Sequence, residues 1–186
     1  MKTPPPIKAS EFNGDLGEFL REYKYQPKLT RKLDDLEDVN LTPELLNEIV
    51  LWKVNRFVSL DGDQLRRIDA LRKLQPGEHG QAHLVLEELL DAHGVDLPMA
   101  STFLRFRNPS VFQIIDRHAY RALYGRDYRL YTQTSPTKKI EVYFAYLDDL
   151  RSLCRLKGLK FDKVDRVLYA FDKKTNGGLT NRKNAE

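Results

Sequence analysis

The chain has 186 residues, of which 41% are hydrophobic and 31% charged, and its formal net charge at pH 7 is +4. This length predicts one compact domain or two small lobes that share a core, and neither a membrane span nor a secretory signal is expected. A single cysteine, Cys154, excludes an internal disulfide and a zinc or iron–sulfur site built from several thiolates.

The two ends of the chain differ from its middle. Residues 1–10 are rich in proline and are expected to be disordered, and residues 175–186 are expected to form a flexible polar tail. Residues 11–174 are expected to form a single helical domain. Apolar residues at helical spacing predict a first helix in 15–25, whereas 27–41 is mixed and charged.

Helix signals dominate the rest of the chain. Thr42-Pro43-Glu44 combines a hydroxyl N-cap, a proline and an acid in the first turn, so a helix is predicted from there to Phe57. Further helices are predicted at 64–74, 81–92, 98–106, 117–124, 136–157 and 161–173. No stretch alternates apolar and polar residues as a strand would, so the predicted fold class is all-α, with roughly eight helices.

A tight turn between two predicted helices contains Gly94, and the second helix begins at once with Pro98. Such a turn exposes successive backbone N–H groups which, with the positive end of the helix dipole, suit a phosphate oxygen. Glycine lets the backbone approach the ligand closely. An ordinary helical hairpin with a glycine cap would give the same pattern.

A carboxylate, Asp116, lies one predicted helix further on, after two isoleucines and before Arg-His. A carboxylate beside a sugar stabilises the positive charge that develops when an N-glycosidic bond breaks, and it can orient or deprotonate a water molecule. Asp116 is also well placed to cap the helix predicted at 117–124. The two roles are compatible, because a cap would fix the position of the carboxylate.

The hairpin followed by the motif Ile-Ile-Asp-Arg-His at 114–118 resembles the helix-hairpin-helix (HhH-GPD) superfamily of DNA glycosylases. The resemblance covers 42–124 in organisation and is specific only in 89–123. It implies a two-lobed, glycosylase-like all-α fold with its hairpin at about 81–106. It also implies base-excision repair of DNA damage: hydrolysis of the bond between a modified base and its sugar, with Asp116 as the catalytic carboxylate.

The resemblance assigns contacts with the DNA backbone to the hairpin and to the motif. Asp96 stands where many members have a second hairpin glycine, and His118 matches the histidine of the family motif. From 105 to 129 the chain carries six arginines and two aspartates, and guanidinium groups match phosphate geometry. The residues expected at the backbone are Gly94, Val95, Asp96, Arg105, Arg107, Arg117, His118 and Arg121. The alternative for each arginine is an ordinary solvated helix face.

The family's nucleophilic lysine is missing from its expected place. In bifunctional members it lies early in the second hairpin helix, where this chain has Pro98, and no lysine occurs between Lys73 and Lys138. Proline has no amine that could attack the sugar. The resemblance therefore implies a monofunctional enzyme, in which water attacks and an abasic site remains. No zinc, redox cofactor or iron–sulfur cluster is expected, and a monovalent cation at the hairpin is compatible with the resemblance.

A glycosylase needs apolar walls for the extruded base and a side chain that fills the gap in the duplex. The expected base-pocket or wedge residues lie on the helix that begins at Thr42 and at its exit: Trp52, Lys53, Asn55 and Arg56. Four other aromatic residues are further candidates: Tyr23, Tyr25, Tyr169 and Phe171. Packing in the core is the alternative for Trp52 and for most of these rings.

The resemblance also names the expected partner, which is double-stranded DNA containing a modified base. No membrane partner is expected, a monomer is the expected state, and the expected location is the cytoplasm in association with the nucleoid. The sequence does not identify the lesion or separate repair from defence against foreign DNA. The alternative function is that of a non-catalytic helix-hairpin-helix DNA-binding protein.

Overall fold

The structure is a computed structural model that describes residues 14–15, 20, 26–35, 40–54, 58, 60–131 and 133–176. Every regular element in these ranges is a helix, which confirms the predicted all-α class. The disordered segment predicted at 1–10, most of the helix predicted at 15–25 and most of the predicted C-terminal tail lie outside the described residues. The chain divides into two compact units, Met1–Phe57 and Val58–Glu186, and this boundary falls inside the single domain expected from the sequence.

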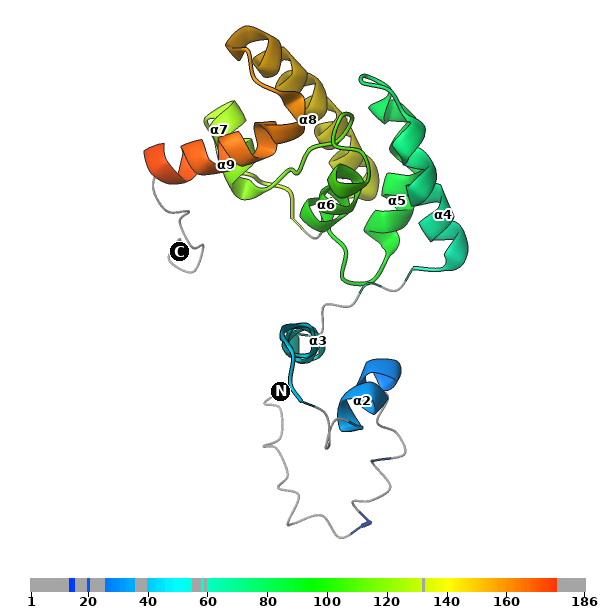
Figure 1. Cartoon of the computed structure of the whole chain (residues 1–186). Coiled ribbons are helices and arrows are strands. Elements are labelled where there is room, and N and C mark those ends of the chain that lie inside the picture. Colours follow the sequence, from blue (N-terminus) through cyan, green and yellow to red (C-terminus); the bar gives the residue numbers. More distant parts are fainter. Residues whose placement is uncertain are drawn as a thin grey trace, which may run out of the picture. The chain divides into compact units, whose positions relative to one another are not determined.

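Two helices are described in the N-terminal unit, α2 (Pro27–Asp34) and α3 (Pro43–Val54) (Figure 1). The start of α3 is as predicted, because the Leu45 amide donates to Thr42 Oγ1 at 3.3 Å. The sequence did not predict α2, which is short and strongly charged. The two helices are joined by an ion pair of 2.6 Å between Lys32 Nζ and a carboxylate oxygen of Glu48.

The C-terminal unit contains the other six α-helices. They are α4 (Gly62–Ala70), α5 (His83–Asp91), α6 (Leu97–Arg107), α7 (Arg117–Tyr124), α8 (Pro136–Lys157) and α9 (Val164–Thr175). Short 3₁₀ turns precede α5 and α9 at His79–Ala82 and Phe161–Lys163. Within this unit α4 and α5 lie on one side, α7 and α9 lie on the other, and α6 and α8 run between them (Figure 1).

Capping residues in the sequence set the ends of α7 and α8 in the C-terminal unit. The Lys138 amide donates to Ser135 Oγ at 3.3 Å at the start of α8. Gly125 and Gly158 follow α7 and α8 with a φ of +66°, the left-handed conformation that ends many helices. These caps explain why the predicted limits of α7 and α8 are confirmed.

A single apolar core holds this unit together, and α8 contributes its centre. Ile140, Leu147 and Leu150 of α8 are almost completely buried, as are Leu86 of α5 and Leu104 of α6. Burial of such side chains stabilises a fold by about 1.5–3 kcal/mol each relative to exposure. The loop between α6 and α7 crosses this core and carries the predicted catalytic aspartate.

Candidate active site

The backbone immediately before Asp116 is held from two helices. Tyr143 Oη donates to the Gln113 carbonyl at 2.9 Å, and Tyr146 Oη donates to the Ile114 carbonyl at 2.8 Å. Both tyrosines belong to α8 and are fully buried. From α6, Ser101 Oγ accepts a hydrogen bond of 3.2 Å from the Ile115 amide. The backbone before Asp116 is therefore held by hydrogen bonds from α6 and α8, and Gln113 and Ile115 are buried while Ile114 is half-buried.

Asp116 is the N-cap of α7, as the sequence predicted. Its Oδ1 accepts a hydrogen bond of 2.7 Å from the Ala119 amide. The cap fixes the position of the carboxylate. Burial chiefly raises the pKa of Tyr146 far above its usual value, and the charges of Asp116 and Asp165 add to this effect.

A small pocket lies beside Asp116. Its volume is about 170 Å³, and it lies between the start of α7 and one side of α9. Its lining consists of Ile114, Asp116, Ala119, Asp165, Arg166 and Tyr169. Drug-sized ligands occupy pockets of about 300–1,000 Å³, so this space suits a smaller group. The pocket thus combines a fixed carboxylate, a second carboxylate and an aromatic ring.

The second carboxylate, Asp165, is only 4% exposed and is part of a buried ion pair. Its Oδ1 accepts from the Arg166 amide at 2.7 Å, and its Oδ2 lies 3.4 Å from Nε of Arg105. Arg105 also donates to the Asp162 carbonyl at 3.0 Å. The predicted placement of Arg105 at the DNA backbone is not seen, because its guanidinium is buried and joins α6 to the start of α9.

A third buried carboxylate, Asp172 of α9, pairs with two other predicted DNA contacts. One of its oxygens lies 2.7 Å from His118 Nδ1, and both oxygens accept from Arg121 at 2.9 and 2.8 Å. Asn176 donates to the same carboxylate at 2.8 Å. Hydrogen bonds from Arg121 first, then from Asn176 and His118, hold the pKa of Asp172 far below its usual value.

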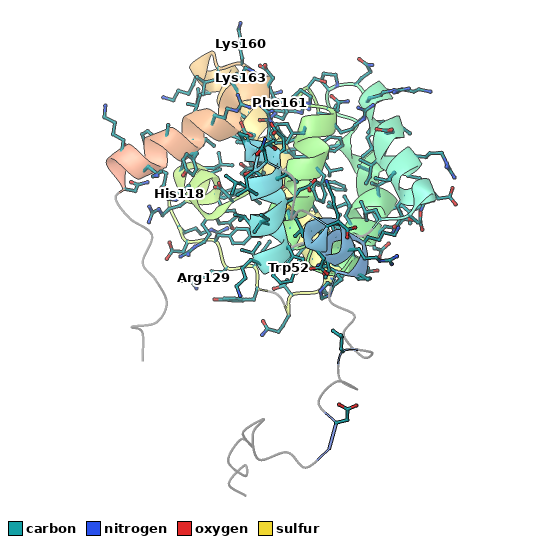
Figure 2. All side chains as sticks on the ribbon, turned by 60° about the horizontal axis from the view of Figure 1, so that its bottom comes forward. Trp52, His118, Arg129, Lys160, Phe161 and Lys163 are labelled. Carbon is teal, nitrogen blue, oxygen red and sulfur yellow. The ribbon has the colours of Figure 1, made fainter. Side chains whose placement is uncertain are left out.

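This arrangement gives His118 and Arg121 a partner that the sequence did not predict. The side chain of His118 (Figure 2) is 18% exposed and that of Arg121 14%, and both pair with Asp172 where α7 meets α9. They join these two helices, and their contact with a DNA strand stays a prediction. Of the remaining arginines, Arg107 pairs with Asp69 at 3.1 Å, whereas Arg117 is exposed at the start of α7.

The predicted hairpin is present between α5 and α6. Gly94 is exposed with a φ of +79°, a conformation that favours glycine, and the next residue, Val95, is buried. Asp96 caps α6, since its Oδ1 accepts from the Leu97 amide at 2.7 Å. The same oxygen lies 2.8 Å from Nζ of Lys139, so the carboxylate at the turn has a cationic partner from α8.

Lys139 is a neighbour of the hairpin that the sequence order did not reveal. Pro98 occupies the first turn of α6, as expected, and the nearby lysine comes from the start of α8. The side chain of Lys139 is 7% exposed and is paired with Asp96. Its amine therefore serves as the ion-pair partner of Asp96 in this structure.

The predicted base-pocket residues belong to the N-terminal unit. Trp52 donates its indole N–H to Thr30 Oγ1 at 2.9 Å and lines a pocket of about 250 Å³ with Leu33 and Ile49. Lys53 is exposed. The other two, Asn55 and Arg56, lie outside the described residues. In its own unit, Trp52 therefore packs α3 against α2.

The C-terminal unit has a larger pocket, of about 570 Å³, between α4 and α6. Its lining is apolar except for Arg107, and it contains no carboxylate, hydroxyl or thiol that could act on a substrate.

In the ranges that the structure covers, no cluster of three or more His, Cys, Asp or Glu side chains is arranged to hold a metal ion. None of the helices described here has both the length and the apolar character needed to cross a membrane.

The sequence missed Ser101, Tyr143 and Tyr146, which position Asp116, and Asp165 and Arg166, which line its pocket. Four of these side chains are polar and buried among apolar neighbours, so they require buried partners, whereas Arg166 is exposed and gave no such signal. Tyr169, one of the further aromatic candidates, does line the pocket.

No family model, no curated protein and no solved structure matches the chain.

Proposed function

We propose that the protein is a DNA glycosylase that hydrolyses the N-glycosidic bond of a damaged or modified base in duplex DNA. The observation that carries this proposal is the fixed carboxylate of Asp116 beside a pocket of about 170 Å³. The glycosylase resemblance of 89–123 supports it. We propose further that the protein acts as a monomer, in the cytoplasm and in association with the nucleoid.

In the proposed reaction, a nucleotide leaves the base stack and enters the pocket beside Asp116. The ring of Tyr169, which is 41% exposed, offers a surface on which the base stacks. As the bond to the base lengthens, the sugar becomes positively charged and the carboxylate of Asp116 stabilises it. Water attacks C1′ and gives a proton to the carboxylate of Asp116, while the base leaves with the electron pair of the broken C–N bond and takes up that proton.

The hairpin is the proposed contact with the DNA backbone. The exposed turn at Gly94 offers its backbone to a phosphate oxygen. The first amides of α6 already donate to Asp96, and Pro98 has no N–H. The ion pair between Asp96 and Lys139 supports this role, because it offsets the repulsion between a carboxylate and a phosphate. It also means that a positive charge is present at the hairpin without a bound metal ion.

The test is base release from short duplexes that each carry one alkylated, oxidised or deaminated base. Because Pro98 has no amine and Lys139 is buried and paired, strand cleavage is expected only after alkali treatment, which cuts abasic sites. Cleavage is measured on denaturing gels with and without the alkali step. Strand cleavage before alkali would contradict the water-mediated mechanism.

The second candidate is a non-catalytic helix-hairpin-helix DNA-binding protein. The small volume of the pocket favours it, because about 170 Å³ is below the usual range for ligand sites. The same experiment separates the two candidates. Salt-dependent binding to every duplex without base release from any of them would support the second candidate and contradict the first.

A further inference from the structure

We propose that the exposed side of α9 is a second surface for the backbone of duplex DNA, which the hairpin resemblance does not assign. This surface, the α9 basic face, consists of Lys163, Arg166, Tyr169 and Lys173. The inference rests on the proposed function, because it concerns the same DNA. It identifies where the strand runs once one of its nucleotides is at Asp116.

The four side chains share one side of the helix. Arg166, Tyr169 and Lys173 follow one another at intervals of three or four positions along α9, which places them in a row. Lys163 precedes them as the N-cap residue of the helix, and all four are exposed. The opposite side of α9 is buried through Val164, Leu168 and Asp172. At about 1.5 Å per residue the row is roughly 15 Å long. A DNA strand carries one negative charge per about 3.4 Å of helix axis, so several phosphates fit along it.

Among the described residues, no ion pair joins a cation of this face to a buried carboxylate. Lys163 is 3.5 Å from Asp162 in a pair whose side chains are 56% and 42% exposed, and such pairs contribute little. Nζ of Lys173 lies 5.2 Å from the centre of the Tyr169 ring. Arg105 and Arg121 differ from these cations, because each of them pairs with a buried carboxylate.

The α9 basic face is continuous with the candidate active site. Arg166 and Tyr169 belong to this face and also line the pocket that contains Asp116. At the other end, Lys163 lies with Lys160 at the corner where α8 gives way to α9 (Figure 2). A strand that places one nucleotide at Asp116 can therefore continue along a row of positive charges.

The chemistry of the row fits nucleic acid. Lysine and arginine neutralise phosphates and release condensed counterions, which makes binding strongly dependent on salt. An exposed tyrosine among these cations provides a stacking surface for an unpaired base. Because these contacts are to phosphates and ring faces, the α9 basic face contributes affinity without sequence preference.

The test compares two triple variants that remove the same charge. One carries Lys163→Gln, Arg166→Gln and Lys173→Gln, and the control carries Arg66→Gln, Arg72→Gln and Lys73→Gln on the exposed side of α4 and the turn after it. Binding to an unmodified duplex is measured at salt concentrations from about 50 to about 200 mM, a range over which phosphate contacts change the affinity strongly. Loss of three phosphate contacts is expected to reduce the salt slope by about 2.7 and the affinity at 0.1 M salt by roughly 100-fold.

The control variant is expected to keep the slope of the wild type, because its cations are not part of the α9 basic face. Equal slopes and affinities for the two variants would overturn the inference while leaving the glycosylase proposal in place. Absence of salt-dependent binding by the wild type would overturn both. Circular dichroism of the α9 variant confirms that its helices are retained, since the three side chains are exposed.

Discussion

Replacing Asp116 with asparagine is expected to reduce base release by at least about 100-fold, the usual effect of removing one group that stabilises a transition state. Asparagine caps helices as well as aspartate does, so the bond from the Ala119 amide can be kept while the negative charge is lost. The expected defect is therefore chemical and not structural. Single-turnover release from the most rapidly processed duplex measures it.

The matched control is Asp61→Asn, the same change at another N-cap of the C-terminal unit. Asp61 accepts from the amides of Asp63 and Gln64 at 2.8 Å at the start of α4 and does not line the pocket of Asp116. This control is expected to release the base at the rate of the wild type. Equal rates for the two variants would remove Asp116 from the mechanism.

Replacing Asp172 with alanine is expected to lower the free energy of unfolding by about 3–5 kcal/mol, because it breaks a buried ion pair on one side. Asp172 is completely buried and accepts four hydrogen bonds from His118, Arg121 and Asn176. Its removal leaves the other groups without their acceptor at the contact of α7 with α9. Urea unfolding of the variant and the wild type measures the difference.

The control for this substitution is Asp69→Ala, which breaks a carboxylate–guanidinium pair at the surface. The side chain of Asp69 is 63% exposed, and its pair with Arg107 has a length of 3.1 Å. Such pairs contribute about 0–1 kcal/mol, so a small change is expected. A loss below about 1 kcal/mol for Asp172→Ala as well would show that the buried network does not fasten α7 to α9.

The contribution of Asp172 should also depend on pH. Hydrogen bonds, chiefly from Arg121, hold the pKa of this carboxyl in the folded protein below its value of about 3.9 in an unfolded chain. A carboxyl whose pKa is lower in the folded protein stabilises the fold fully at pH values above its pKa in the unfolded chain. This stabilisation is lost as the pH falls toward the pKa of the folded protein. The stability difference between wild type and Asp172→Ala is therefore expected to be constant near neutral pH and to narrow below about pH 3.9.

Local signals were sufficient for most of the fold. The limits of α7 and α8 were predicted because Asp116 and Ser135 begin these helices and glycines end them, and all of these effects act within one turn. The helix α2 was missed because its apolar positions, Leu29 and Leu33, are too few to outweigh the charged residues around them. The N-cap role of Asp116 was likewise predicted from its neighbours alone.

The partners of charged residues could not be predicted in the same way. Arg105 bonds to a residue 57 positions away, and His118 and Arg121 pair with Asp172 at separations of 54 and 51. A helical wheel shows which side of its own helix an arginine occupies, but not which acid faces it. The visible signal was on α9, where Asp172 shares an apolar side with Leu168 and therefore needed buried partners.

The most direct measurement does not require the lesion to be known. One nucleotide of a duplex is replaced by a pyrrolidine abasic analogue, whose protonated ring nitrogen imitates the positive charge of the sugar, and the reference duplex carries an uncharged tetrahydrofuran ring. If Asp116 stabilises that charge, the wild type binds the charged analogue at least about 100-fold more tightly, and Asp116→Asn loses this preference. Equal affinity of the wild type for the two duplexes would contradict a catalytic role for Asp116.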